Sequence, residues 1–393
     1  MDHERIEKLI QYVEGIQAGE NGTELHRKFK AEIESVQPLE IFHIFDKLLG
    51  EGGREGDIIQ YVDKVVNVFY KSLSTYEWQK PPEDDFINDL MAENTALVSK
   101  MDTLKDLIKK GGCSENRQEM IEVILELRQF NEHYIKKENI LFPYLEKSSV
   151  EFHGLSIMWA LHDKVRHDLK ESVELLKNPL SGEEEIKRKV GSLIFGMLGV
   201  LKKEELILFP VASEVLEHAT WSEMYRQSLE YEYALVERER PQTPLRETLV
   251  KSDDEAFPQA VFKTETGEMS FSQLKAVFEA LPMDMTFVDA EDKVRYFSKP
   301  KDRIFPRSAA ILGRDVRNCH PPESVYKVLE IIEGFKMGTR EKADFWIDHR
   351  GHKILIQYFA LRDTTGQYLG TLEVSQIVDD IMQLEGEKRL LSE

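Results

Sequence analysis

A six-residue pattern occurs twice in the middle of this chain, and it constrains the fold more than any other feature. The sequence Glu-Asn-Ile-Leu-Phe-Pro at 138–143 resembles Glu-Leu-Ile-Leu-Phe-Pro at 205–210, about 67 residues later. Two earlier segments, 93–97 and 161–165, align at almost the same offset. The repeat predicts two related helical hairpins. We expect them to form one bundle, with a site near the pseudo-twofold axis that both halves supply.

Apolar periodicity around the repeat predicts four long helices, at about 86–110, 115–146, 153–178 and 183–217. The breaks between them fall at Gly111-Gly112, Ser148-Ser149 and Asn178-Pro179. This number and length of helices suit an antiparallel up-down bundle. We place this domain at residues 84–218.

The bundle also has polar residues at regular places in the repeat. In the first half His133 lies two turns before the Leu-Phe-Pro motif, and in the second half the carboxylate Glu204 lies one turn before it. A histidine near a helix start, then a histidine and a carboxylate one turn later, resembles the hemerythrin-like (HHE) cation-binding family. That resemblance implies a non-haem di-iron centre to which each half contributes imidazole and carboxylate ligands.

The pattern of ligands is incomplete in this chain. The positions that correspond to histidine ligands are Asn94, His133, His162 and Val200. One turn after His133 stands Lys137, where the family pattern requires a carboxylate, whereas Glu204 stands correctly after Val200. Glu138 lies about 140° around an ideal helix from His133, so it does not share that face without distortion. The candidate metal ligands are therefore His133, His162, Glu204 and Glu138, and bound non-haem iron is one interpretation of them.

The other interpretation is a polar core without metal. Lys137 would project its ammonium inward and pair with Glu204, because a buried lysine needs such a partner. Asn94 would belong to the same core, and His133 and His162 nearby would titrate close to neutral pH. A third possibility is that both histidines are ordinary core residues with satisfied hydrogen bonds.

Residues 1–78 read as a series of short helices interrupted by glycines at 19–22 and 50–56. They resemble the small helical domain of unknown function that precedes hemerythrin-like domains in many bacterial proteins. The resemblance rests on short motifs at 33–36, 40–41, 48–52 and 61–63. We expect a helical module for docking or dimerisation.

The last third of the chain changes character. After a polar, proline-containing connector at 219–268, strand-like runs alternate with turn residues and surround one helix at 324–335. These features predict an α+β domain with an antiparallel sheet at 269–393. The domain resembles the PAS family, whose curved sheet implies a cavity for a ligand that the sequence leaves unknown. The resemblance is carried by residues 281–289, 294–297, 318–322, 345–347 and 367–374.

Two alternatives apply to the conspicuous residues of this domain. Cys319 and His320 are either cavity ligands or the end of a loop stiffened by the prolines that follow. Three aromatic residues are either cavity lining or core: Phe297, Phe345 and Trp346. The tail at 376–391 has near-heptad apolar spacing, which favours a short coiled-coil helix and a homodimer formed through it or through the PAS domain.

Composition excludes several classes of function. The formal net charge of −20 disfavours nucleic acid as a partner. Two cysteines, Cys113 and Cys319, fall in different domains and support neither a disulfide framework nor a cysteine-based zinc site. The start of the chain has no secretory pattern, and the longest apolar stretch, 192–201, is too short to span a bilayer. We therefore expect a cytoplasmic protein with no membrane segment.

We expect a sensor or regulatory protein rather than an enzyme. A ligand, redox or pH signal in the bundle or the PAS domain would change a protein partner or self-association. One alternative is a non-haem iron protein that handles O2, NO or iron. Another is a scaffold with a degenerate metal site.

Overall fold

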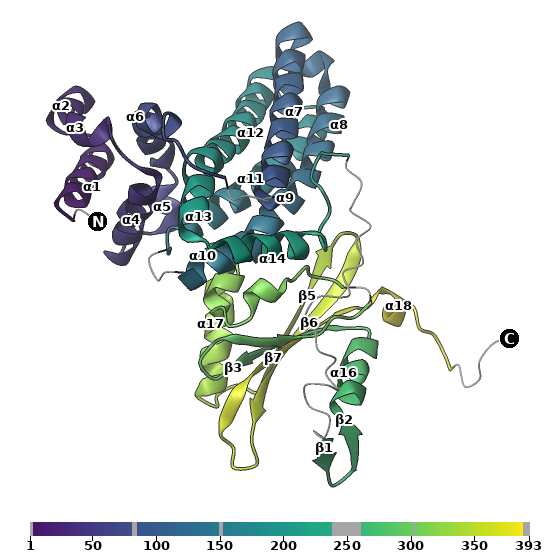
Figure 1. Cartoon of the computed structure of the whole chain (residues 1–393). Coiled ribbons are helices and arrows are strands. Elements are labelled where there is room, and N and C mark those ends of the chain that lie inside the picture. Colours follow the sequence, from purple (N-terminus) through teal and green to yellow (C-terminus); the bar gives the residue numbers. More distant parts are fainter. Residues whose placement is uncertain (1–2, 81–84, 149–151, 238–260, 302, 388–393) are drawn as a thin grey trace. The chain divides into compact units, whose positions relative to one another are not determined.

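A computed structural model of the 393-residue chain describes residues 3–80, 85–148, 152–237, 261–301 and 303–387. The chain forms two compact units, one built by residues up to 241 and one built mainly by residues from 242 onward. The first is all-α and the second is α+β (Figure 1). In the described part of the chain, no helix is both long and apolar enough to cross a membrane.

The first unit begins with a group of short helices, as the glycine breaks predict. In α4, Pro38 occupies the first turn, and Gln37 and Glu40 form a capping box that satisfies free backbone N–H groups. Asn21 caps α2 by accepting hydrogen bonds from two backbone N–H groups. The helices are α1 (His3–Gln17), α2 (Gly22–Lys28), α3 (Lys30–Ile33), α4 (Pro38–Gly50), α5 (Glu55–Ile58) and α6 (Val62–Ser74).

Four long helical segments follow, close to the predicted ranges, and they form the bundle (Figure 1). The first segment is α7 (Asp85–Glu115), in which Gly112 leaves the helical conformation with φ +78°, so the predicted break is confirmed. The second segment is α8 (Arg117–Leu127), η1 (Arg128–Phe130), α9 (Asn131–Lys136), η2 (Lys137–Leu141) and α10 (Phe142–Ser148). The third is α11 (Leu155–Lys177), and the fourth is α12 (Glu183–Lys203), η3 (Glu204–Leu208) and α13 (Phe209–Val215).

The two repeat motifs each contain a π-helical turn, which the helical periodicity does not predict. The turns η2 and η3 are both π-helical and occupy equivalent places in the two hairpins. Each is followed two residues later by a proline, Pro143 or Pro210. A proline ring clashes with the carbonyl four residues earlier and donates no N–H, and a locally widened turn accommodates both effects. The repeat thus reproduces a backbone irregularity as well as a sequence.

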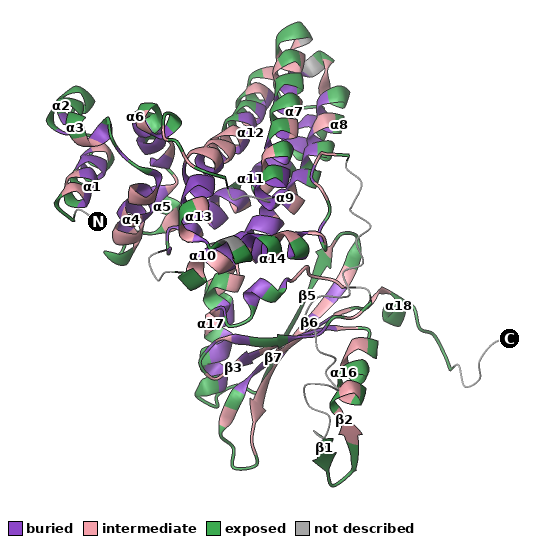
Figure 2. Cartoon of the chain, in the orientation of Figure 1, coloured by how far each residue is buried: buried purple, intermediate pink, exposed green. Residues whose placement is uncertain are grey.

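The N-terminal helices and the bundle share one continuous apolar core, which runs from Ile6 to Ala234. Buried residues follow the inward sides of the bundle helices, and the outer sides are exposed (Figure 2). The rings of Phe42 in α4 and Phe152 lie 5.2 Å apart across this junction. Polar contacts reinforce it, including an ion pair between Asp63 of α6 and Lys203 of α12. The N-terminal helices are therefore packed as part of the same unit as the bundle.

The expected connector at 219–268, in which we expect some helix, begins with a helix that belongs to the first unit. A helix, α14 (His218–Ser228), packs onto the bundle and buries Trp221 and Met224. These two residues lie three apart on one helix face, and two positions are too few to show a helical period in the sequence. At the other end, β1 (Val261–Thr264) and β2 (Gly267–Ser270) form an antiparallel hairpin that leads into α16 (Phe271–Ala280). Residues 238–260 lie outside the described part of the chain.

The second unit contains the predicted antiparallel sheet. Among the described residues the sheet has five strands, in the order β4-β3-β7-β6-β5. The strands are β3 (Asp284–Asp289), β4 (Val294–Phe297), β5 (Lys342–His349), β6 (His352–Arg362) and β7 (Tyr368–Ile377). All five strand-like runs of the sequence fall within these strands, which confirms them. Alternate residues of β6 are buried against α17 (Pro322–Lys336), beginning with Ile354 and Ile356.

The predicted coiled-coil tail is not present in the described residues. Ile377 is the last residue of β7, and only the short helix α18 (Asp379–Met382) follows it. Leu384 is exposed, and Leu390 lies outside the described residues. Cross-strand pairing with β6 continues as far as Ile377, so the backbone there is extended and cannot begin a heptad repeat.

Gly370 offers a test of the sheet. Its φ of +147° and a built Cβ only 2.2 Å from the Val288 carbonyl oxygen leave no space for a side chain. We expect Gly370→Ala to destabilise this unit far more than Gly366→Ala, which has φ +86° but open space. The second change should cost about 1–2 kcal/mol for the left-handed backbone alone. Hydrogen exchange of the β3 and β7 amides measures the difference, and equal protection in both variants would contradict this packing.

Candidate functional site

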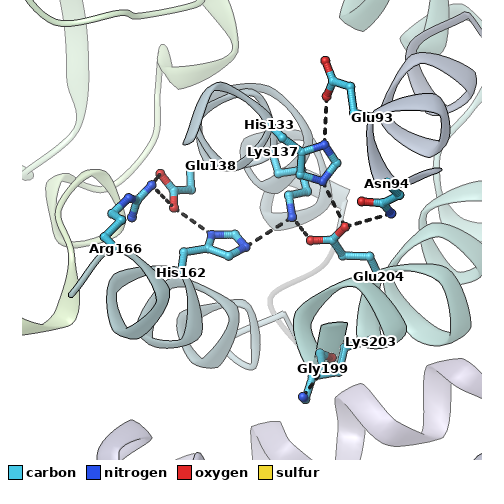
Figure 3. A network of polar contacts seen from close by, with 10 residues as sticks. All are labelled: Glu93, Asn94, His133, Lys137, Glu138, His162, Arg166, Gly199, Lys203 and Glu204. Carbon is cyan, nitrogen blue, oxygen red and sulfur yellow. Dashed lines mark hydrogen bonds and ion pairs between the residues drawn. The ribbon is translucent and has the colours of Figure 1, made fainter. Parts of the chain in front are cut away.

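His133 is fully buried and lies at the centre of a polar network inside the bundle (Figure 3). It is the third residue of α9, and its ring stacks on Phe130 with centroids 4.4 Å apart. Its Nδ1 lies 2.9 Å from a carboxylate oxygen of Glu93 and its Nε2 lies 3.0 Å from one of Glu204. The imidazole therefore links two helices of opposite halves, α7 and the η3 turn.

Lys137 points into the bundle, as predicted, and is completely buried. Its ammonium donates to Glu204 and lies 3.2 Å from Nε2 of His162. The charge also sits over the ring of Tyr134, 4.8 Å from its centroid. Asn94 completes the contacts of Glu204 by donating its amide N–H at 3.2 Å. The predicted Lys137–Glu204 pair and the polar role of Asn94 are both present in the structure.

His162 of α11 is held from the opposite side. Its Nδ1 lies 2.7 Å from Glu138, and its ring stacks on Tyr134 with centroids 4.2 Å apart. Glu138 in turn accepts two hydrogen bonds of 2.9 Å from the guanidinium of Arg166. A neutral imidazole satisfies this arrangement, with Nδ1–H donating to Glu138 and Nε2 accepting from Lys137. Burial and the nearby Lys137 both lower the pKa of His162, which favours that neutral form.

The placement of Glu138 corrects one expectation. As a candidate metal ligand it would face the same interior point as His133. Instead it lies behind His162 and pairs with Arg166, away from the centre (Figure 3). Its position five residues after His133 places it about 140° around the helix, on the other side. Glu138 orients an imidazole rather than joining a ligand set.

Sequence reasoning missed the outer members of the network. Glu93 is buried, accepts hydrogen bonds from Lys136 and from the backbone N–H of Ala234, and shares a hydrogen bond with Nδ1 of His133. The sequence does contain a signal for Glu93, because this residue directly precedes Asn94, which stands at a ligand position of the repeat. Glu93 lies on an inward face of α7. Arg166 and Lys136 gave no such signal, since a charged residue on a helix usually marks the solvent face. His167 is exposed, as expected from its spacing.

The contacts of His133 require one more proton than neutral histidines supply. Both of its ring nitrogens face carboxylate oxygens, yet a neutral imidazole has only one N–H. Burial lowers the pKa of His133 and raises the pKa of Glu93, so the carboxyl of Glu93 is the favoured position of the additional proton.

The formal charges of the network agree with that proton. With it, the negative and positive charges of the connected side chains balance, which is the condition for burying them at tolerable cost. The cations are Lys136, Lys137 and Arg166, and the carboxyls are Glu93, Glu138, Asp163 and Glu204. The contact that favours this proton, between Glu93 of α7 and His133 of α9, lies within the first hairpin.

The candidate residues of the second unit are more dispersed. Phe297 is buried in the core beside α17, which confirms the core interpretation. Cys319 is the last residue of the turn η5 (Val316–Cys319), and its thiol donates a hydrogen bond to the Asp315 carbonyl. His320 follows directly, and both Cys319 and His320 are half-buried. Phe345 and Trp346 contradict the expectation of core or cavity lining, since they are 36% and 68% exposed. Both lie on β5, the last strand of the sheet, where one side lacks a neighbouring strand.

A polar cluster lies on the inner face of the sheet instead. Asp284 of β3 accepts backbone hydrogen bonds from Ile304 and Phe305, at 3.1 and 3.0 Å. Arg307 and Glu373 of β7 form an ion pair of 3.5 Å. Burial and Glu373 both raise the pKa of Tyr358, so this phenol stays protonated. None of these positions stands out in the sequence, because single polar residues in strands normally face solvent.

Comparison with known proteins supports the domain assignments. Residues 85–218 match the hemerythrin HHE cation binding domain family, and residues 274–379 match a PAS domain family. No curated protein is similar enough to the chain to give a match.

Several solved structures resemble parts of the chain. The crystal structure of a C-terminal domain from Streptococcus mutans is 28% identical, with a TM-score of 0.31, and the match covers 32% of this chain and 98% of that one. A PAS domain from Colwellia psychrerythraea is 13% identical, with a TM-score of 0.23, and covers 28% and 97% of the two chains. A sensory box sensor histidine kinase from Vibrio cholerae is 9% identical, with a TM-score of 0.21, and covers 27% and 89%.

The residues present do not fit the di-iron centre that the hemerythrin family implies. Lys137 places an ammonium between Glu204 and His162, and Val200 offers no ligand atom. Within the described residues, no group of three or more histidine, cysteine or acidic side chains is arranged to hold a metal ion. His133, His162 and Glu204 are therefore brought together, but around a cation supplied by the chain itself.

Removing the buried lysine alone should be costly. Lys137→Met leaves Glu204 buried without its cation, and we expect the free energy of unfolding to fall by about 3–5 kcal/mol. The double variant Lys137→Met/Glu204→Gln should recover most of that loss, because neither charge remains. Chemical denaturation measures both. As a control, Lys100→Met breaks an exposed pair with Glu126 and should cost at most about 1 kcal/mol. Additive effects of the two buried substitutions would contradict the pairing.

The histidines predict a dependence of stability on pH. The pKa of His162 is lowered in the folded chain, so below pH 6.5 the unfolded chain takes up protons that the folded chain refuses. Stability conferred by neutral His162 is therefore present above that pH and lost as the pH falls. The raised pKa values of Glu93 and Glu138 act in the opposite direction.

A titration-silent variant isolates the contribution of His162. Glutamine can donate to Glu138 and accept from Lys137, so His162→Gln keeps the contacts but carries no titrating group. We expect Tm to fall less between pH 7.5 and 5.5 in this variant than in the unmodified chain. Parallel curves for the two proteins would show that His162 does not contribute.

Proposed function

Because this chain joins a hemerythrin HHE domain to a PAS domain, we propose that it is a sensor or regulatory protein whose bundle works without a resident di-iron centre. The combination of the two domains suggests sensing. The proposal assigns the bundle a role in transmitting a signal through helix packing, and it assigns the output to a protein partner or to self-association. It includes no catalytic step.

One observation carries this proposal, namely the position of the Lys137 ammonium between Glu204 and His162. In the hemerythrin-like pattern a metal cation would bind where imidazole and carboxylate ligands from the two halves converge. Here a side chain provides the positive charge, so cohesion of the two hairpins does not depend on metal supply or oxidation state. The network still responds to protons, because its charge balance depends on an additional one.

The network is also connected to the N-terminal helices. Lys203, the residue before Glu204, is buried and pairs with Asp63 of α6, and it also donates to the Gly199 carbonyl (Figure 3). A built Cβ on Gly199 would lie 3.2 Å from Asp63, so the two helices approach closely here. A change in the network has a short route to α6, which supports a regulatory role for the N-terminal helices.

Metal analysis tests the proposal directly. The full chain, purified without oxygen and without chelator, should contain far less than one equivalent of iron, and removal of metal should leave its Tm unchanged. Two irons per chain would overturn the proposal and favour a non-haem iron protein.

A substitution that restores the family pattern sharpens this test. Lys137→Glu places a carboxylate beside His133, His162 and Glu204, which together supply two imidazoles and two carboxylates. We expect this variant to bind at least one equivalent of a divalent metal and to gain thermal stability with it. The matched control Lys137→Gln removes the same ammonium without adding a charge and should bind none. Failure of Lys137→Glu to bind metal would contradict the assigned geometry.

A further inference from the structure

A lysine-lined groove lies between the N-terminal helices and the bundle, away from the buried network. Helices α6, α7 and α12 border this open groove, which has a volume of about 560 Å³. This lies within the range of roughly 300–1,000 Å³ that is usual for sites that bind small molecules. Four ammonium groups border it, from Lys105 and Lys109 of α7 and from Lys187 and Lys202 of α12.

The floor of the groove is apolar. Ile194, Phe195 and Leu198 of α12 lie between the two α12 lysines in sequence and share a helix face with them. Ile108 contributes from α7, and Val66 from α6. Phe195 is 60% exposed, an unusual state for a phenylalanine in a helix that otherwise buries its large apolar residues. The groove therefore combines a cationic border with an uncovered apolar surface.

The lysines keep much of their charge available. Lys105 pairs with Asp102 at 2.9 Å, and Lys187 pairs with glutamates of the same helix at 3.4 Å. Such exposed pairs contribute only about 0–1 kcal/mol, so a ligand can replace them. Lys202 donates to the neutral amide of Asn67, and within the described residues Lys109 makes no ion pair.

The acid that borders the groove does not offset this charge. Asp63 is already paired with the buried Lys203. In a chain with a formal net charge of −20, four lysines around one cavity form a local exception that favours an anion.

We propose that this groove binds an amphipathic organic anion, with a carboxylate between the lysines and an apolar body on the floor formed by Ile194, Phe195 and Leu198. The proposal goes beyond the sensor function. It involves neither a metal nor the Lys137 network, so it stands or falls separately from the metal analysis.

Isothermal titration of the full chain with decanoate, below its aggregation concentration, tests the proposal. Gly191 of α12 borders the groove, and a Cβ built on it meets nothing within 4 Å. Gly191→Phe fills the cavity, and because glycine is unfavourable in a helix interior by about 1 kcal/mol, the variant should fold at least as well. We expect decanoate affinity to fall by about tenfold or more in Gly191→Phe, and to be kept in Gly191→Ala.

A charge reversal provides the second arm. Lys109→Glu should weaken decanoate binding by about tenfold. Its neighbour Lys110 lies outside the groove and pairs with Asp106, so Lys110→Glu is the matched control and should bind decanoate as the unmodified chain does. Decyltrimethylammonium, which has the same chain length and the opposite charge, should not bind.

Three results would overturn the proposal. Decanoate failing to bind, or binding equally to Gly191→Phe, would exclude the groove as its site. Equal binding of decanoate and decyltrimethylammonium would show an apolar surface without anion selectivity. In the first of these cases, a change of the sedimentation coefficient in Gly191→Phe would mean that the substitution disrupts a dimer. The groove would then be covered by a second copy of the chain.

Discussion

The contact between Lys137 and Glu204 is the constraint on which the bundle interior depends. Each residue comes from one of the two repeated hairpins, and neither can be buried as an ion without the other. Around them His133 contacts Glu93 and His162 contacts Glu138, so two further buried carboxylates are held in place. The hairpins are thereby joined by internal charges as well as by apolar packing.

The repeat explains why the charges meet at that point. The two π-helical turns begin at Lys137 and Glu204, so duplication of the hairpin placed these residues at equivalent positions across a pseudo-twofold axis. Opposite charges at equivalent positions attract across such an axis, whereas two carboxylates would require a cation between them. The lysine at one of these positions thus supplies internally the positive charge that two carboxylates would require.

Packing extends this arrangement beyond the bundle. The N-terminal helices share its apolar core, and α6 contacts α12 one residue before Glu204 through the Asp63–Lys203 pair. The same junction forms the lysine-lined groove. The buried network and the proposed anion site in the groove would then both act on α6 and α12. Under these proposals, the packing of these two helices would depend on pH at one place and on a bound anion at the other.

The bundle with its four helical segments and the five strands can be predicted from local spacing, because periodicity and the repeat are local features. The same spacing predicts that four polar residues meet inside the bundle: His133, His162, Lys137 and Glu204. Only the tertiary structure decided that Glu138 and Arg166 support His162 from behind, that Glu93 completes His133, and that Trp346 is exposed on the last strand of the sheet. Those outcomes depend on how the helices pack against one another and on strand order. Both are set by contacts between segments far apart in the chain, which local spacing does not encode.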